Sequence, residues 1–183
     1  MKNTLTFLVL LLCSSASTLD AQQFISREGH IRFFSSTPLE DIKAESVQMS
    51  AILDAGKNGG FAFQIPILTF HFDKALMEEH FNESYLESEK HPRATFEGAI
   101  LNWEDLNPTL GWQDVVASGN LNVHGVSQTR TIQGQMQFNA GSWEIKAEFD
   151  VLTVDHEIQI PKMVRKQIAE SISVSVDAIL TPR

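Results

Sequence analysis

Cysteine is almost absent from this chain of 183 residues: the single one, Cys13, lies near the N-terminus. A lone cysteine excludes an intrachain disulfide framework and gives no basis for thiol catalysis. Lipidated cysteines follow small residues, whereas Leu11 and Leu12 precede Cys13. We therefore do not expect a lipoprotein.

Basic residues are also scarce. The chain has 14 Lys and Arg against 23 Asp and Glu, a net charge of −9. This acidic balance argues against nucleic-acid binding and against electrostatic docking on anionic lipid. No glycine-rich phosphate loop and no Gly-x-Ser-x-Gly nucleophile motif is present. We expect no enzymatic activity and no cofactor.

Long apolar runs are missing except at the N-terminus. Leu5 to Leu12 is an apolar stretch broken only by Thr6, preceded by Lys2 and followed by small residues. This pattern is typical of a secretory signal peptide and is too short to span a bilayer. We expect residues 1–21 to be the signal, with cleavage after Ala21 or, as second choice, after Ala16. Residues 22–183 would then form one domain, periplasmic or secreted, without stable membrane insertion.

Period-two alternation dominates the rest of the chain and predicts strands. Short turn signals such as Gly56–Gly60, Gly125 and Asn139–Ser142 separate the runs, which indicates antiparallel neighbours. We predict an all-β fold: an antiparallel, lipocalin-like barrel of about eight strands, closed so that no edge remains exposed. The clearest alternating runs are 61–67, 95–100, 120–124, 131–138, 143–151 and 171–178.

Two segments depart from alternation. Residues 73–81 read as a short amphipathic helix with Asp73 as its N-cap. Residues 161–169 place Val164 and Ile168 four apart behind Pro161, which predicts a second short helix. We expect one or both to cap or plug the barrel.

The six histidines match no zinc-binding spacing, so we predict no metal site. Asp155, His156 and Glu157 are adjacent in the sequence. Neighbouring residues of a strand point to opposite faces, so these three side chains would not converge. We interpret them as a solvated strand end.

Two blocks of the sequence resemble the YceI-like family of bacterial exported proteins. "FDKALMEEHFNESYLESEKHPRATFEGAI" is similar to that family's central block, and "ASGNLNVHGVSQTRTIQGQM" to its His-Gly-Val hairpin. The resemblance implies an extended lipocalin-like barrel that binds a long isoprenoid or similar amphiphile in the periplasm. It therefore suggests a non-catalytic carrier or buffer of such lipids.

A closed barrel of about eight strands holds either its own side chains or one small ligand. The alternative is thus a stress-response or interaction module with a filled core. The sequence also leaves a homodimer open. If the barrel is hollow, we expect an apolar lining and, near a mouth, polar contacts from Tyr85 and His124. The predicted lining is Phe61, Phe63, Ile65, Ile67, Phe70, Phe72, Leu76, Met77, Phe81, Phe96, Val123, Met136, Phe138, Trp143 and Phe149.

Overall fold

The computed structural model describes residues 23–183, and the predicted signal segment and Cys13 lie outside them. Eight long strands and one two-residue strand make up most of this part of the chain. This confirms the predicted all-β class. The strands are β1 (Gln23–Ser36), β2 (Asp41–Asp54), β3 (Gly60–Pro66), β4 (His71–Phe72), β5 (Arg93–Ile100), β6 (Gln113–Val123), β7 (Val126–Asn139), β8 (Ser142–Leu152) and β9 (Ser171–Pro182).

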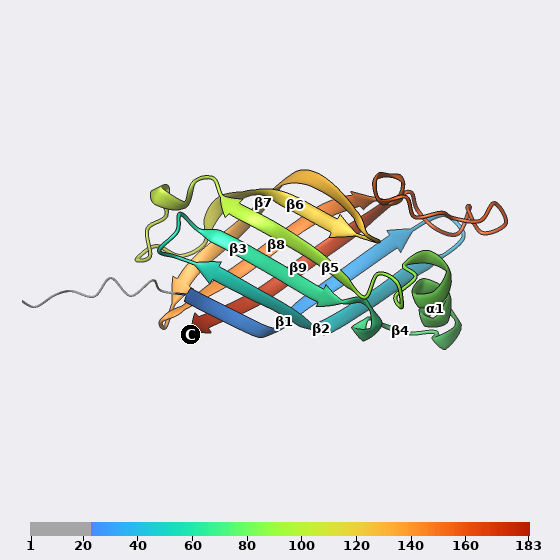
Figure 1. The fold of residues 1–183 in the computed structure, drawn as a ribbon, viewed down its shortest axis with the longest axis horizontal. Helices are drawn as coiled ribbons and strands as arrows, with labels where there is room; N and C mark the ends of the chain where they lie inside the picture. Colours follow the sequence, from blue (N-terminus) through green and yellow to red (C-terminus); the bar gives the residue numbers. More distant parts are fainter. Residues whose placement is uncertain (1–22) are drawn as a thin grey trace, which may run out of the picture.

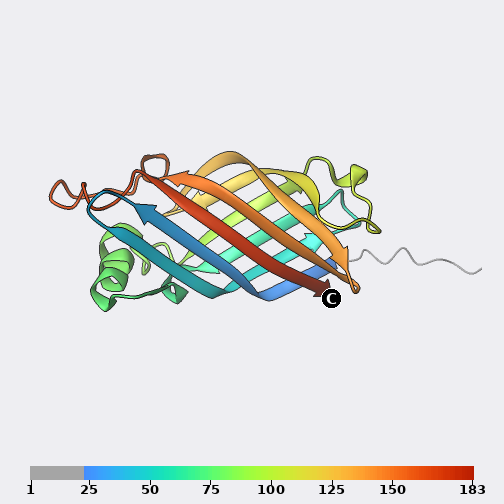
Figure 2. The same ribbon diagram turned by 180° about the vertical axis from the view of Figure 1, so that it is seen from behind.

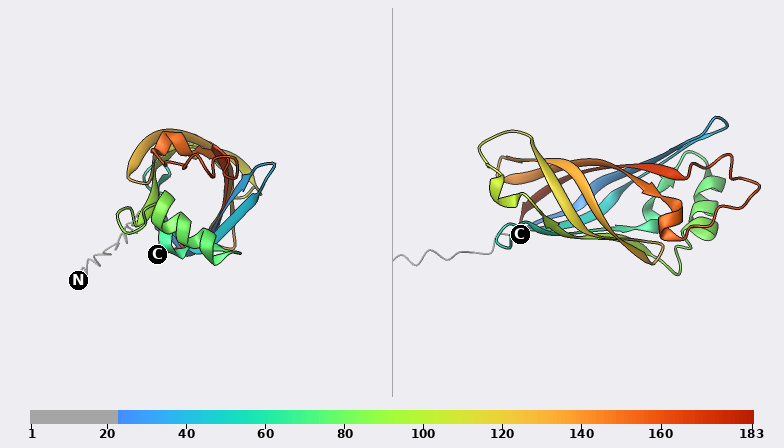
Figure 3. Two further views of the ribbon diagram at one scale, coloured as in Figure 1. Left: turned by 90° about the vertical axis from the view of Figure 1, so that its right-hand side faces the viewer. Right: turned by 90° about the horizontal axis from the view of Figure 1, so that it is seen from above.

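The long strands form a closed antiparallel barrel (Figures 1 and 2). Their order is β1-β9-β8-β7-β6-β5-β3-β2, and pairing of β1 with β2 closes the ring. Phe33 of β1 shows the closure directly, since it lies opposite Ala44 of β2 and Val174 of β9. Viewed along the barrel, the strands surround a common centre (Figure 3). Closure leaves none of the eight long strands with a free edge.

Two hairpins use two-residue turns at opposite ends of the barrel. His124 and Gly125 join β6 to β7 with φ of 53° and 76°, and Ala140 and Gly141 join β7 to β8 with φ of 49° and 83°. Two successive left-handed residues match the twist of flanking strands. The turn signals predicted from the sequence at both places are confirmed.

The helical segment before β5 is shorter and less regular than predicted. Helix α1 covers Ala75–His80, and one turn of π-helix, Phe81–Tyr85, continues it. Asp73 is not its N-cap: Lys74 holds that position without a side-chain hydrogen bond. Instead, the Glu78 carboxylate accepts a hydrogen bond from the Phe72 backbone N–H at 3.2 Å. This hydrogen bond holds the backbone at Phe72, just before the helix, in place.

The second predicted helix, 161–169, is wrong. This segment forms turns, with single hydrogen bonds from Val164 N to Pro161 O (3.1 Å) and from Gln167 N to Val164 O (2.8 Å). Nine residues are too few for a helix to be stable by its own hydrogen bonds. Val164 and Ile168 reach the barrel interior, whereas the charged residues between them stay exposed.

The interpretation of 155–157 as a solvated strand end is also wrong. Thr153–His156 is a 3₁₀ turn, and His156 is fully buried. Its Nδ1 donates a hydrogen bond to the Val126 carbonyl at 3.0 Å, which ties this turn to the start of β7.

The two ends of the barrel differ. Helix α1, the β6–β7 turn and the 157–170 segment lie at one end, and the β7–β8 turn and the C-terminus lie at the other (Figures 1 and 3). Aromatic rings fill the C-terminal end: Phe138 packs on Phe24 at 6.1 Å and on Trp143 at 5.2 Å between centroids. Trp103 packs on Trp143 at 5.2 Å. No helix within residues 23–183 has the length and apolar character that crossing a bilayer requires.

Candidate functional site

The barrel encloses a cavity of about 580 Å³. Strand alternation builds it, because every second side chain of each strand points inward. Its walls come from the long strands, and α1 with the 157–170 segment contributes residues at one end. The volume is typical of a site for a small organic ligand. The barrel is therefore not filled by its own side chains.

Most of the predicted lining residues do meet around this cavity. Tyr85 is also among its walls, at the end that carries α1. The predicted residues that line the cavity are Phe61, Phe63, Ile65, Ile67, Phe70, Phe72, Leu76, Met77, Phe81, Phe96, Val123, Met136 and Phe149.

Phe138 and Trp143 do not line it, contrary to the prediction. Both have the inward parity of their strands, but they lie at the C-terminal end of the barrel within the aromatic cluster described above. Trp143 is only 4% exposed there. The odd or even position of a residue along its strand predicts whether its side chain faces inward or outward. It does not predict how far along the barrel axis the side chain lies.

His124 also lies outside the lining. Its ring points to the corner that follows the π-helical turn, where Nε2 is 3.2 Å from a Glu87 oxygen and Nδ1 is 3.2 Å from the His156 carbonyl. The side chain is held by these two contacts and is not one of the cavity walls.

Four phenylalanines gather where α1 meets the barrel wall. The Phe33 centroid is 5.5 Å from Phe70, 5.6 Å from Phe72 and 5.4 Å from Phe81. Phe81 is in turn 5.0 Å from Phe72. These contacts join β1, β4 and the π-helical turn into one apolar patch over this end of the cavity, which we call the mouth cluster.

Phe33 lines the cavity but is not among the lining residues predicted from the sequence. The alternation of β1 could have identified it, since Ile31 and Phe33 are two residues apart and both face the cavity. Beyond β1, inward residues of β8 and β9 such as Ile145, Val174 and Val176 also line it. They follow from the same period-two rule applied to those strands.

Polar groups are few and lie mainly toward the α1 end. Lys74 Nζ donates to a Glu40 oxygen at 2.8 Å, so these two lining charges neutralise each other. Burial raises the pKa of the Tyr85 hydroxyl above its ordinary value, which keeps it a neutral donor and acceptor. An apolar cavity with a few polar groups at one end suits an amphiphile: a chain inside and a head group outside.

Comparison with solved structures identifies the same fold elsewhere. A polyisoprenoid-binding domain from Saccharophagus degradans, implicated in plant cell wall breakdown, superposes with a TM-score of 0.75 at 14% identity, over 89% of this chain and 99% of that one. BcnA from Burkholderia cenocepacia gives 0.70 at 14%, over 82% and 95%. A YceI protein from Campylobacter jejuni gives 0.57 at 11%, over 76% and 84%.

At these identities the likeness concerns the fold. None of the curated proteins compared with the chain matches it. A sequence model of the YceI-like domain, however, matches residues 17–180, which is nearly the entire chain and includes both blocks singled out above. Together with the closed eight-stranded barrel, this match means that the chain belongs to the YceI-like family.

Proposed function

We propose that this protein binds a lipid with a long apolar chain, of the polyisoprenoid class, inside the barrel. The apolar cavity of about 580 Å³ carries the proposal. The likeness to a domain described as polyisoprenoid-binding supports this ligand class.

Energetics favour exchange over permanent capture. Each five-carbon isoprene unit moved from water into the cavity contributes about 3–4 kcal/mol. Such a lipid starts from a bilayer, however, where most of this gain is already realised, and association itself costs roughly 4–15 kcal/mol. The barrel would therefore take lipid from membranes and return it. This behaviour suits a carrier or a buffer.

The head group would lie at the α1 end. There the polar residues among the cavity walls include the Tyr85 hydroxyl, His80 and the paired Glu40 and Lys74. These groups can donate hydrogen bonds to, and accept them from, an alcohol or quinone head group.

The proposed compartment is the periplasm or the exterior of the cell. It rests on the signal-like residues 1–21. N-terminal sequencing of protein recovered from a periplasmic fraction tests it: a mature chain that begins at Gln22 supports export, and an uncleaved Met1 in the cytoplasm contradicts it.

Cavity filling tests the binding site. Ala117 of β6 faces the cavity, and Asn120 on the same strand is exposed on the outside. We expect Ala117→Trp to abolish uptake of a fluorescent polyprenyl probe, because the indole would occupy the space of the chain. Asn120→Trp, which adds the same side chain outside, would bind like the parent protein. Equal binding by both variants would contradict a site within the barrel.

A further inference from the structure

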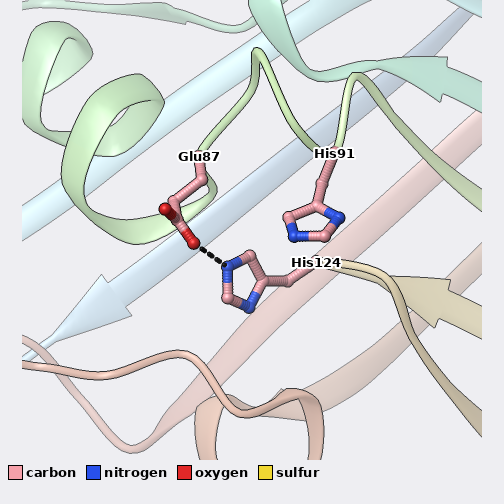
Figure 4. Close-up of side chains that lie close together, drawn as sticks. All are labelled: Glu87, His91 and His124. Atoms are coloured by element: carbon pink, nitrogen blue, oxygen red, sulfur yellow. Dashed lines mark hydrogen bonds and ion pairs between the residues drawn. The ribbon is translucent and has the colours of Figure 1, made fainter.

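Three side chains that can ligate a metal meet beside the barrel mouth, apart from the cavity. Glu87 and His91 follow the π-helical turn, and His124 begins the β6–β7 turn (Figure 4). One ligand atom from each lies within 4.8 Å of the other two, and all three residues are half-buried. The sequence reading missed this cluster because its members are distant along the chain.

Backbone geometry brings Glu87 and His91 to the same side. The His91 N–H donates to the Glu87 carbonyl at 2.9 Å, which closes a single turn and places residues four apart next to each other. The His91 ring lies over Gly125, where an added Cβ would be 2.7 Å from its Cε1 and Nδ1. Its centroid is 4.7 Å from that of His124.

The contacts of His124 orient one ring nitrogen toward the centre of the cluster. Nδ1 faces the His156 carbonyl at 3.2 Å, and a carbonyl only accepts, so Nδ1 carries a proton. Nε2, the second ring nitrogen, faces a Glu87 oxygen 3.2 Å away. With Nδ1 engaged by the carbonyl, Nε2 is the atom that can ligate a metal ion, and a carboxylate oxygen already lies beside it.

Glu87 offers one of its two carboxylate oxygens to the same position. Lys90 pairs with the other oxygen, Oε1, and its own side chain is largely exposed. The Oε2 atom that faces His124 is therefore the one available to an ion.

We propose that Glu87, His91 and His124 form a binding site for a divalent first-row transition ion, with Zn²⁺ the best fit. Two imidazoles and one carboxylate are a donor set that zinc uses, with solvent in the fourth position. Tetrahedral zinc bonds of about 2.0–2.1 Å place donors roughly 3.3 Å apart. The Glu87–His124 pair is already at 3.2 Å, and a His91 ring nitrogen lies within 4.8 Å of both ligand atoms.

The His156 carbonyl contributes to this assignment. Histidines that ligate metals usually donate their second N–H to a carbonyl or carboxylate, which orients the ring. His124 has this arrangement. A bound ion would connect the corner after the π-helical turn to the β6–β7 turn, and so fasten the segment that carries α1 to the barrel wall.

Isothermal titration of metal-free, tag-free protein with Zn²⁺ tests the site without any lipid. We expect saturable one-to-one binding that EDTA reverses. Glu87→Gln and His91→Gln keep side chains of similar size, and each should weaken binding by at least about tenfold. His30→Ala is the control: His30 Nε2 is 2.8 Å from Glu45, and within residues 23–183 no third ligand joins this His–Glu pair, so its loss should leave binding unchanged.

A second readout guards against variants that merely unfold. Co²⁺ bound at a site with two imidazoles and a carboxylate absorbs in the visible range, and the absorption should vanish in both Gln variants while their circular dichroism stays that of the parent. Absence of saturable Zn²⁺ binding would overturn the proposal. Binding that neither Gln variant weakens would also overturn it, by assigning the zinc to other histidines.

Discussion

The Phe33 ring of β1 stacks on the Phe81 ring of the π-helical turn, with centroids 5.4 Å apart and planes inclined by 26°. We call residues 73–85, which lie over this end of the barrel, the lid. Because Phe33 lies on β1 between β2 and β9, its contact with Phe81 attaches the lid to the strands that close the barrel. Aromatic packing holds the lid in place more than its own helix propensity does. Its six-residue α-helix is too short to be stable alone.

Loss of the Phe33 ring should therefore loosen the lid. We expect Phe33→Ala to lower the free energy of unfolding by about 2 kcal/mol, since the ring is half-buried. It should also accelerate lipid release several-fold. Stopped-flow transfer of a fluorescent polyprenyl probe to vesicles measures the release rate.

The neighbouring Phe34→Ala variant is the control. Phe34 points outward, is 38% exposed and contacts Lys43 with its ring. Its removal should leave the release rate unchanged. Equal acceleration by both variants would mean that the lid does not control release.

The two hairpin glycines provide a matched pair for the His91 contact. Gly125 and Gly141 both hold the second position of a two-residue turn at positive φ, so alanine adds backbone strain at each. Only at Gly125 does the new Cβ also meet a ring, that of His91. At Gly141 nothing lies within 4 Å of it.

We therefore expect Gly125→Ala to cost more stability than Gly141→Ala, with both measured by urea unfolding. The excess should shrink when Gly125→Ala is combined with His91→Ala, since the contact is then absent. Such a double-mutant cycle isolates the pair. Additive effects of the two substitutions would show that the His91 ring does not rest on this turn in solution.

At the opposite end of the barrel, a core substitution should lower the free energy of unfolding without changing lipid binding. Trp143 is buried among Phe138, Trp103 and the other core residues but is not a wall of the cavity. Trp143→Ala should lower the free energy of unfolding by about 3–5 kcal/mol. The folded variant should still bind lipid like the parent.

Trp112 is the control, because its side chain is exposed and Lys146 Nζ lies 4.1 Å from its ring centroid. Trp112→Ala should cost no more than about 1 kcal/mol. A large loss of lipid affinity in folded Trp143→Ala would place the ligand deeper in the barrel than the cavity walls indicate.

Acid should weaken the corner after the lid. The pKa of Glu87 is lower in the folded state than its ordinary 4.5, because Lys90 and His124 donate hydrogen bonds to the carboxylate. A carboxyl whose pKa is lower in the folded state stabilises the protein at pH values above its unfolded pKa. This stabilisation is lost as the pH falls through the folded pKa. Unfolding in urea with EDTA, followed from pH 6 downward, should thus show a shallower acid decline for Glu87→Gln than for the parent.

Glu144 offers the comparison at the other end of the barrel. Asn139 and then Gln137 donate hydrogen bonds that lower the pKa of its carboxyl in the same direction. Glu144→Gln should therefore flatten the acid decline in the same sense while leaving zinc binding intact. An unchanged pH dependence in Glu87→Gln would show that its carboxylate is not hydrogen-bonded in the folded protein.

The alternation of apolar and polar residues and the turn residues predict most of this fold. Alternation in segments such as 61–67 and 131–138 predicts which side chains face inward, and the turns at Gly125 and Asn139–Ser142 fix antiparallel neighbours. Both depend only on residues close together in the chain. The barrel and most of the cavity walls follow from them.

Features that depend on contacts distant in sequence could not be predicted in this way. Phe138 and Trp143 have the correct parity, but their height along the barrel depends on strand register and tilt. His156 is buried because its turn folds back on Val126. Glu87 and His124 meet only because β5 and β6 pair between them and return the chain to the same end of the barrel.

Lipid binding inside the barrel can be tested by native mass spectrometry of protein purified from its own host. We predict a one-to-one adduct that organic extraction identifies as a polyprenyl or quinone species and that is absent from Ala117→Trp. A bare protein mass, with no adduct even after incubation with polyprenyl lipids in vesicles, would contradict it.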